Sequence, residues 1–218
     1  MPLGLLTRRP LLAGQVVMLA ASGVLVASYF LSSLVLQRLL GLTALATGLV
    51  FLPVALATIA GSQLGAQAVG RLGPRPVAAA AFSLAAAGAL LLARLPVDAS
   101  IGIDLLPGLL LVTGGVGACF VVATTTALGH VGQAQAGLTS GLLNTCHELG
   151  GSLGVALASA IGAASLSSGP LAGRPPVTGF DRAFLALAAL AALSAVATIW
   201  LLPGRPPATG RPITPTDR

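Results

Sequence analysis

Three polar side chains with capacity for proton exchange or ligand contact lie close together in an apolar stretch of this sequence. Asn144, His147 and Glu148 fall inside the run 137–166, which is long enough for one hydrophobic helix. An ionisable group is costly in hydrocarbon, so such residues face protein, water or a partner. An imidazole and a desolvated carboxylate both exchange protons near neutral pH. These three residues are candidates for proton coupling or substrate contact, and we predict such a role for at least one of them. The alternative is that they satisfy each other or a neighbouring backbone and only fix packing.

Two enzyme motifs overlap this stretch, and both lack the context they need. His147 and Glu148 begin an H-E-x-x-H zinc motif, but Gly151 stands where the second histidine is required. Residues 150–154 match G-x-S-x-G, a motif that needs a strand-to-helix turn rather than a helix interior. All 11 basic residues are arginines, which removes any Walker A or Schiff-base lysine. We predict no enzyme activity, no metal and no cofactor, and we interpret Cys119 and Cys146 as free thiols in apolar surroundings.

The composition indicates which elements hold these groups. The chain has 218 residues, of which 56% are hydrophobic and 7% charged, and its mean hydropathy is +0.97. These values exclude an ordinary soluble domain and predict a polytopic membrane protein. The net charge of +6 comes from arginines between apolar runs and near the end of the chain, so it indicates topology rather than nucleic-acid binding.

Six apolar runs are each long enough to cross a bilayer, which needs about 20 residues. We therefore predict an all-α fold with a membrane domain at 12–202, a cytoplasmic segment at 1–11 and a disordered tail at 203–218 that is rich in Pro, Gly, Thr and Arg. The first run is too long for the apolar core of a signal peptide and is predicted to stay as an anchor. The six runs are 12–36, 44–69, 77–95, 103–128, 137–166 and 180–202.

The arginines favour one orientation in the membrane. With the N-terminus inside, seven of the eleven arginines fall on the cytoplasmic side, and Asp98, Asp104 and Asp181 fall on the outer side. Positive loops remain cytoplasmic. We predict a multi-pass protein of the plasma membrane with both termini in the cytoplasm.

Polar residues in the first run share one helical face. Three of them are spaced by seven residues and two more continue at four-residue steps, so they point at protein or water rather than at lipid. The fourth run has a shorter set of threonines, at 113 and 124–126. Serine and threonine in membrane helices also bond their own backbone carbonyls, which is the alternative interpretation. The predicted cavity-lining residues are Gln15, Ser22, Tyr29, Ser33, Gln37 and Thr113.

Glycines in the fifth run recur four residues apart and leave a strip without side chains, where another helix can approach closely. The residues predicted to serve helix packing are Gly137, Gly141, Gly150, Gly151 and Gly154.

A tight basic turn is predicted between the second and third runs. It is written G-R-L-G-P-R-P at 70–76, with glycines for unusual dihedral angles and arginines near helix ends and headgroups. The residues of this loop motif are Arg71, Gly73, Arg75 and Pro76.

Three segments together resemble the major facilitator superfamily, and within it the fourteen-span drug:proton antiporters. The basic turn resembles the family's G-x-L-x-x-R-x-G-x-R-P loop. Residues 36–53 are similar to its L-Q-x-x-x-G-x-[ST] stretch and the F-L-P that follows. The fifth run resembles its G-x-x-N-x-x-R-Q-x-G-G-S-x-G helix, matched by Gly141, Asn144, Gly150, Gly151, Ser152 and Gly154.

The resemblance implies half of a major facilitator fold, six helices as two inverted three-helix repeats. It covers the C-terminal six spans only, and the family's N-terminal half has no counterpart in this chain. In the family substrate binds between two halves near the midplane. By analogy the first and fourth spans line the cavity, and the second and fifth meet the other half. The sequence departs from the family pattern in two ways: His147-Glu148 replaces an Arg-Gln pair, and Gly70 replaces an acidic residue.

The leading hypothesis is therefore a half-size or truncated permease for proton-coupled efflux of a small amphipathic compound across the lipid bilayer. It would need a second half, either another copy or a separately encoded N-terminal half. The alternatives are a membrane fragment that transports nothing and a membrane-embedded interaction partner. No nucleic-acid partner is expected.

Overall fold

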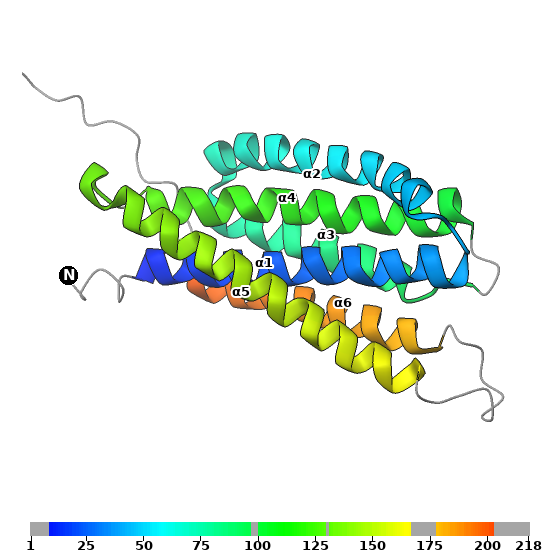
Figure 1. The fold of residues 1–218 in the computed structure, drawn as a ribbon. Coiled ribbons are helices and arrows are strands. Elements are labelled where there is room, and N and C mark those ends of the chain that lie inside the picture. Colours follow the sequence, from blue (N-terminus) through cyan, green and yellow to red (C-terminus); the bar gives the residue numbers. More distant parts are fainter. Residues whose placement is uncertain (1–8, 97–99, 130, 167–177, 203–218) are drawn as a thin grey trace, which may run out of the picture.

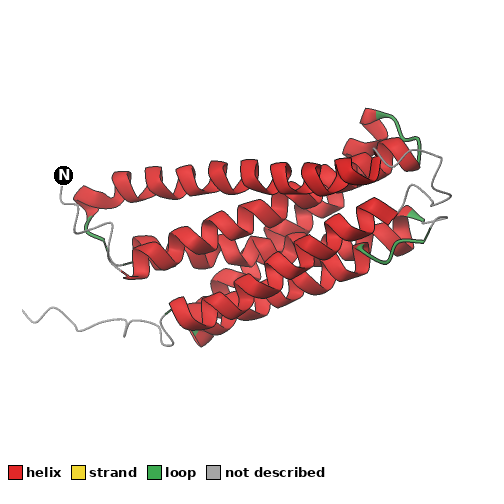
Figure 2. Ribbon diagram, turned by 90° about the horizontal axis from the view of Figure 1, so that it is seen from below, coloured by secondary structure: helices red, strands yellow, loops and turns green. Residues whose placement is uncertain are grey.

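The computed structural model describes residues 9–96, 100–129, 131–166 and 178–202, and all regular secondary structure in these ranges is helical (Figures 1 and 2). Two of the long helices are extended by short π-helical turns, one after α1 and one before α4. The elements are α1 Arg9–Leu34, η2 Val35–Leu39, α2 Ala44–Leu72, α3 Pro74–Leu92, η3 Ile101–Leu105, α4 Leu106–Leu128, α5 Gln133–Leu166 and α6 Thr178–Leu201.

The predicted all-α membrane fold is confirmed. Six spans were expected, and five of the six long helices in the described residues are long and apolar enough to cross a membrane: Arg9–Leu39, Ala44–Leu72, Pro74–Leu92, Ile101–Leu128 and Phe180–Leu201. Helix α5, which contains the predicted fifth span, is long enough but is not among them, because its polar residues lower its hydropathy. The fifth helix in chain order, α5, begins at Gln133, four residues before the predicted start of its apolar run. The added residues are alternating Gln and Ala, which are good helix formers without being hydrophobic. The predicted tail at 203–218 and residues 1–8 lie outside the described ranges.

Local sequence explains where several helices begin. The Thr43 hydroxyl accepts a hydrogen bond from the amide of Ala46 and caps α2, and Ser100 caps η3 through the amide of Ile103, both at 3.3 Å. Pro74 occupies the first position of α3, where a missing amide proton costs nothing.

The basic turn is shorter than predicted. Arg71 belongs to α2, Arg75 and Pro76 belong to α3, and Gly73 alone joins the two helices, with φ of +88°. Gly70 is an ordinary helical residue of α2, so the prediction that both glycines adopt unusual dihedral angles is wrong for this one. Of the two glycines in this turn, only Gly73 has a backbone conformation that L-residues with side chains rarely adopt.

The helices form two repeats around a central pair. Helices α1 and α4 lie side by side in opposite directions, α2 packs on α4, α5 packs on α1, and α3 and α6 pack together on the other side (Figure 1). Exchanging α1 with α4, α2 with α5 and α3 with α6 leaves the main contacts unchanged. This is the arrangement of inverted three-helix repeats.

A glycine seam occurs in the same place in both repeats. Residues 61–65 read G-S-Q-L-G and residues 150–154 read G-G-S-L-G. Gly61 and Gly65 lie against Gly114 and Ala118 of α4, and their counterparts on α5 lie against α1. In each seam the backbones of two parallel helices are in contact. A Cβ added at one of these glycines would clash with the facing helix, so the approach depends on glycine.

The glycines of α5 therefore serve different surfaces. Gly150 lies against the backbone of Leu19, Gly154 against Gly23, and Gly151 against Val26, all on α1. The expectation that this strip meets a separate half is wrong for these three residues, since α1 of the same chain already fills the space. Gly137 and Gly141 have no atom within 4 Å of an added Cβ and are exposed.

Candidate functional site

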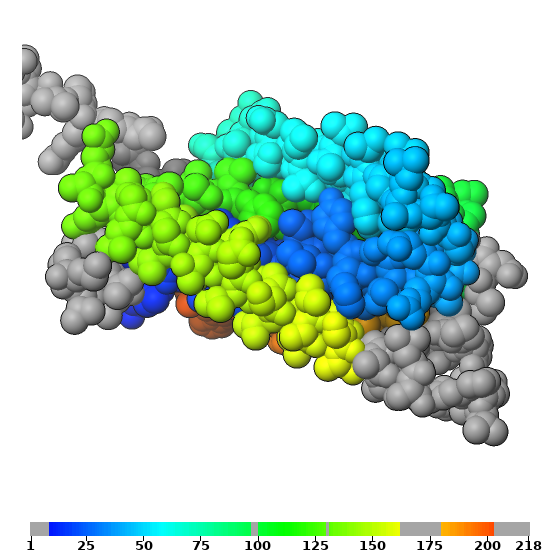
Figure 3. Space-filling view, in the orientation of Figure 1, coloured from blue at the N-terminus to red at the C-terminus, as the bar shows by residue number. Residues whose placement is uncertain are grey.

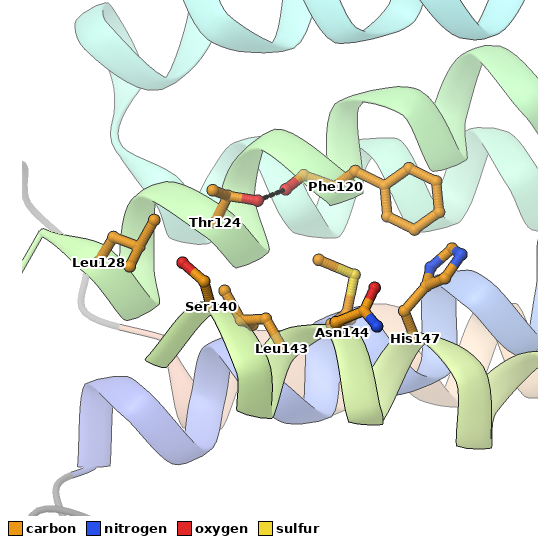
Figure 4. Close-up of a pocket in the computed structure, with 8 residues that line it drawn as sticks. Phe120, Thr124, Leu128, Ser140, Leu143, Asn144 and His147 are labelled. Carbon is orange, nitrogen blue, oxygen red and sulfur yellow. Dashed lines mark hydrogen bonds between the residues drawn. The ribbon is translucent and has the colours of Figure 1, made fainter. Parts of the chain in front are cut away.

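A pocket of about 380 Å³ opens between α1, α4 and α5, towards the end of the bundle where α4 ends and α5 begins (Figure 4). Half of its lining is apolar and half carries hydrogen-bonding groups. The lining residues are Met18, Phe120, Thr124, Leu128, Ser140, Leu143, Asn144 and His147.

The imidazole of His147 is held between two neighbouring helices. Its Nδ1 lies 2.6 Å from Oγ of Ser22, which is fully buried on α1. Its ring meets the ring of Phe120 on α4 edge to face, with centroids 5.5 Å apart. A hydrogen bond at Nδ1 fixes the ring orientation and leaves Nε2 as the nitrogen available to other groups.

Helix packing explains why these side chains meet. His147 lies one turn before Gly150, where α5 touches the backbone of α1. Because no side chain separates the two helices there, a serine hydroxyl can reach the imidazole across the seam. In the other repeat the residues at the matching place are Thr58 and Gly117, which are in backbone contact and carry no imidazole.

The remaining polar groups of the pocket differ in their availability. The Thr124 hydroxyl already donates to the carbonyl of Phe120, at 2.8 Å. Ser140 and Asn144 are exposed on α5 and point into the pocket (Figure 4). Their hydroxyl and amide can bond a ligand, while Met18 and Leu143 provide apolar contact.

Glu148 lies elsewhere. It follows His147 directly and therefore points about 100° away on the helix. Its side chain is exposed and does not line the pocket. Among the described residues no carboxylate lines the pocket, so the two ionisable groups predicted together serve different surfaces.

The polar stripe predicted on the first helix divides among three places. Ser22 bonds His147, whereas Tyr29 meets Phe51 of α2 edge to face with ring centroids 4.9 Å apart. Ser33 accepts a hydrogen bond from Gln37 at 2.9 Å, at the far end of α1 and in η2. Gln15 is half-buried and does not line the pocket.

Thr113 is fully buried and does not face the pocket. Its hydroxyl lies 2.9 Å from the carbonyl of Leu109 and 3.2 Å from that of Val54 on α2. Thr113 therefore ties α4 to α2 rather than binding a ligand.

Sequence reasoning missed the apolar lining. Met18, Phe120, Leu128 and Leu143 are ordinary hydrophobic residues of membrane helices, and nothing in their spacing distinguishes them. Phe120 had one weak signal, its place just before the threonines at 124–126.

The two enzyme motifs noted in the sequence fall within helix α5. Helix α5 is continuous through 150–154, and Ser152 donates its hydroxyl to the carbonyl of Glu148 at 2.8 Å. The Ser152 hydroxyl is therefore bonded within its own helix, and Ser152 does not lie on the sharp turn that the G-x-S-x-G motif requires. No group of His, Cys, Asp and Glu suited to a metal occurs among the described residues, and Cys119 and Cys146 are free.

Comparison with known proteins points to one family. Residues 1–155 match the sequence model of the Major Facilitator Superfamily. A puromycin resistance protein of Streptomyces alboniger is 37% identical over 125 residues, which are 56% of this chain and 25% of that protein. A lincomycin resistance protein of Streptomyces lincolnensis is 33% identical over 153 residues, which are 68% of this chain and 30% of that protein.

A third relative, a tetracenomycin C resistance and export protein of Streptomyces glaucescens, is 30% identical over 159 residues, which are 72% of this chain and 29% of that protein. The chain thus spans less than a third of the length of these relatives. The family match covers most of the sequence, and the inverted three-helix repeats agree with it. This chain belongs to the major facilitator superfamily.

Proposed function

We propose that this chain is one six-helix unit of a proton-coupled exporter of small amphipathic compounds in the plasma membrane. The observation that carries the proposal is the pocket between α1, α4 and α5, in which an imidazole joins apolar and hydrogen-bonding groups. Such a mixed lining suits a compound with an apolar ring system and a few polar substituents. The relatives named for resistance to puromycin and lincomycin and for export of tetracenomycin C agree with that ligand class.

In the proposed mechanism, His147 is the group that exchanges protons. Its ring spans the interface of three helices, so gain or loss of a proton changes the hydrogen bonding between α1 and α5. A change at such an interface biases a packing equilibrium, which is how a titratable group drives alternating access. Glu148 acts at the surface of α5 outside the pocket.

The proposed unit works with a second six-helix unit. The pocket is open on one side, and a substrate site in this family lies between two such units. With the N-terminus in the cytoplasm, as the arginines favour, the pocket would open towards the cytoplasmic half of the membrane.

An efflux assay tests the proposal. Cells that contain the chain would be loaded with a fluorescent amphipathic cation, and release would be followed with and without a protonophore. We expect release above the empty-vector level, its collapse with the protonophore, and a strong reduction in His147→Ala. Release equal to the vector at pH 6 and pH 8 would contradict the proposal.

One observation favours the second candidate function, a membrane-embedded interaction partner. The face of α5 that carries Gly137, Gly141 and Glu148 is exposed and combines small and polar groups. If the chain only binds another integral protein, it should co-purify with that protein in fixed ratio and show no release of the dye.

A further inference from the structure

A second cavity, which we call the lateral groove, lies between α1, α5 and α6 and has a volume of about 130 Å³. Two buried residues of α1, Ala27 and Leu31, form its floor. Its walls include Leu157 of α5 and Leu187 of α6, near the end of the bundle where α5 ends and α6 begins. Figure 3 shows α5 lying over α6, of which only small parts are visible beneath it.

The lining of the lateral groove suits hydrocarbon rather than water. Every described residue that lines it is Ala, Gly, Leu or Ile. A cavity of about 150 Å³ lined by Leu, Ile and Phe stays dry and binds benzene. Leu157 lines the groove and is 57% exposed, so the groove opens on the outside of the bundle. In a membrane, the hydrocarbon outside the bundle consists of lipid acyl chains.

One positive charge lies beside the lateral groove. Arg182, Ala186 and Leu190 follow one another at steps of four on α6, so they share one side of the helix, and the last two line the groove. The Arg182 side chain is exposed, and among the described residues none forms an ion pair with it. Asp181 lies on a different side of α6, the side of the buried Phe184 three residues later.

The depth of the lateral groove matches one leaflet of a bilayer. The apolar span of α6 begins at Phe180, so Arg182 lies at its edge, where a guanidinium reaches the headgroups. Leu190 is eight residues further along α6, which is about 12 Å at the rise of an α-helix. Half of a hydrocarbon core is about 15 Å thick. The groove therefore lies within one leaflet, with Arg182 at the level of the headgroups.

We propose that the lateral groove binds an anionic phospholipid, with one acyl chain between α5 and α6 and the phosphate on Arg182. Arginine suits this partner because its planar fork donates two parallel hydrogen bonds to a phosphate. The headgroup is anionic because the charge that continues the lining is a guanidinium, while the carboxylate of Asp181 lies elsewhere on the helix. The groove shares no lining residue with the pocket at His147. The inference therefore goes beyond the proposed function and does not depend on export.

Photo-cross-linking in vesicles tests the inference. The full chain would be reconstituted in phosphatidylcholine with a trace of phosphatidylglycerol that carries a diazirine in the middle of one acyl chain. Mass spectrometry of peptides would locate the label, which we expect to concentrate at 154–161 of α5 and 186–190 of α6. Phosphatidylcholine with the same diazirine chain should label these positions several times less. Label spread evenly over all the spans, or equal label from the two lipids, would overturn the inference.

Matched substitutions test the acyl-chain site and the headgroup contact separately. Ala186→Phe fills the groove and should remove the label there, whereas Ala189→Phe, exposed on α6 outside the lining, should leave it unchanged. Arg182→Gln should lower the label from phosphatidylglycerol by roughly two- to fivefold, the effect of an exposed ion pair. Arg94→Gln is its control, since Arg94 is exposed after α3 at the same end of the bundle.

Each substitution has an outcome that contradicts the site. Equal label in Ala186→Phe and Ala189→Phe would overturn the acyl-chain site, and equal label in Arg182→Gln and Arg94→Gln would overturn the headgroup contact. Background label on α2, which should stay at the wild-type level, shows that a variant is folded. Arg182→Gln changes an exposed side chain and keeps the test decisive if Ala186→Phe does not fold.

Discussion

Ser22 and His147 lie 125 positions apart in the chain, yet Oγ of Ser22 is 2.6 Å from Nδ1 of His147. The contact crosses the seam at which Gly150 lets α5 touch α1. The other repeat has the same seam without an imidazole, so the pair distinguishes the two halves of an otherwise repeated bundle. The imidazole at one seam only is the reason that we assign the proposed proton exchange to α5 rather than to α2.

Substitutions at this pair should separate proton exchange from positioning. We expect His147→Ala to abolish the pH dependence of efflux, because the group proposed to exchange protons is removed. Ser22→Ala should lower the rate and keep the pH dependence, because the imidazole remains but loses its orientation. The rate of dye release at several pH values measures both. Ser28→Ala is the control, since that hydroxyl bonds the carbonyl of Leu25 at 2.7 Å and should leave release unchanged.

The seam makes a prediction about stability. Gly150→Ala places a methyl group against the backbone of Leu19, where neither chain can yield easily. We expect a loss of about 1–3 kcal/mol in the free energy of unfolding, the usual cost of overpacking. Thermal unfolding in detergent measures it. Gly137→Ala is the matched change on the same helix, where the space is open, and should be neutral or slightly stabilising. Equal shifts of the unfolding midpoint in Gly150→Ala and Gly137→Ala would contradict the close backbone contact between α5 and α1 at Gly150.

Much of the fold follows from sequence alone, because apolar runs and their breakers fix where membrane helices begin and end. The polar groups were harder to place. Tyr29 and Ser22 share one stripe, but one meets α2 and the other α5, because α1 lies between both helices. The sequence contains almost no indication that Phe120 lines the pocket, since hydrophobic residues are normal in every membrane-spanning helix. The glycines of α5 predicted a close helix contact, but the partner expected for them, a separate half, was wrong for the three glycines at 150–154, which lie against α1 of the same chain.

The turn between α2 and α3 offers an opposed pair of substitutions. Gly73 has φ of +88°, so Gly73→Ala forces a strained backbone and should destabilise by about 1 kcal/mol or more. Gly70 is helical with open space around it, so Gly70→Ala should stabilise by about 0.5–1 kcal/mol. Thermal unfolding of both variants beside the wild type should shift the midpoint in opposite directions. A shift of the same sign would mean that the turn rearranges.

The hydroxyl of Thr113, buried between α2 and α4, should contribute little to the stability of the protein, although it lies near two carbonyl groups. Thr113→Val keeps the shape and removes a hydroxyl that lies near the carbonyls of Leu109 and Val54. Interhelical hydrogen bonds in membranes contribute only about 0.6 kcal/mol on average. We expect a small fall in the unfolding midpoint and unchanged dye release, as the side chain is away from the pocket. Thr125→Val, whose exposed hydroxyl bonds its own helix, should change neither quantity.

The orientation proposed from the arginines can be read by labelling. In a chain without its native cysteines, Arg71→Cys lies at the end of α2 and Arg38→Cys in η2, both exposed and at opposite ends of the bundle. If positive loops remain inside, a membrane-impermeant maleimide added to intact cells should label the second variant and leave the first unlabelled. Opening the cells should make the first reactive as well, which shows that its thiol is accessible. Labelling of Arg71→Cys in intact cells would reverse the orientation, and the pocket would then open to the outer half of the membrane instead.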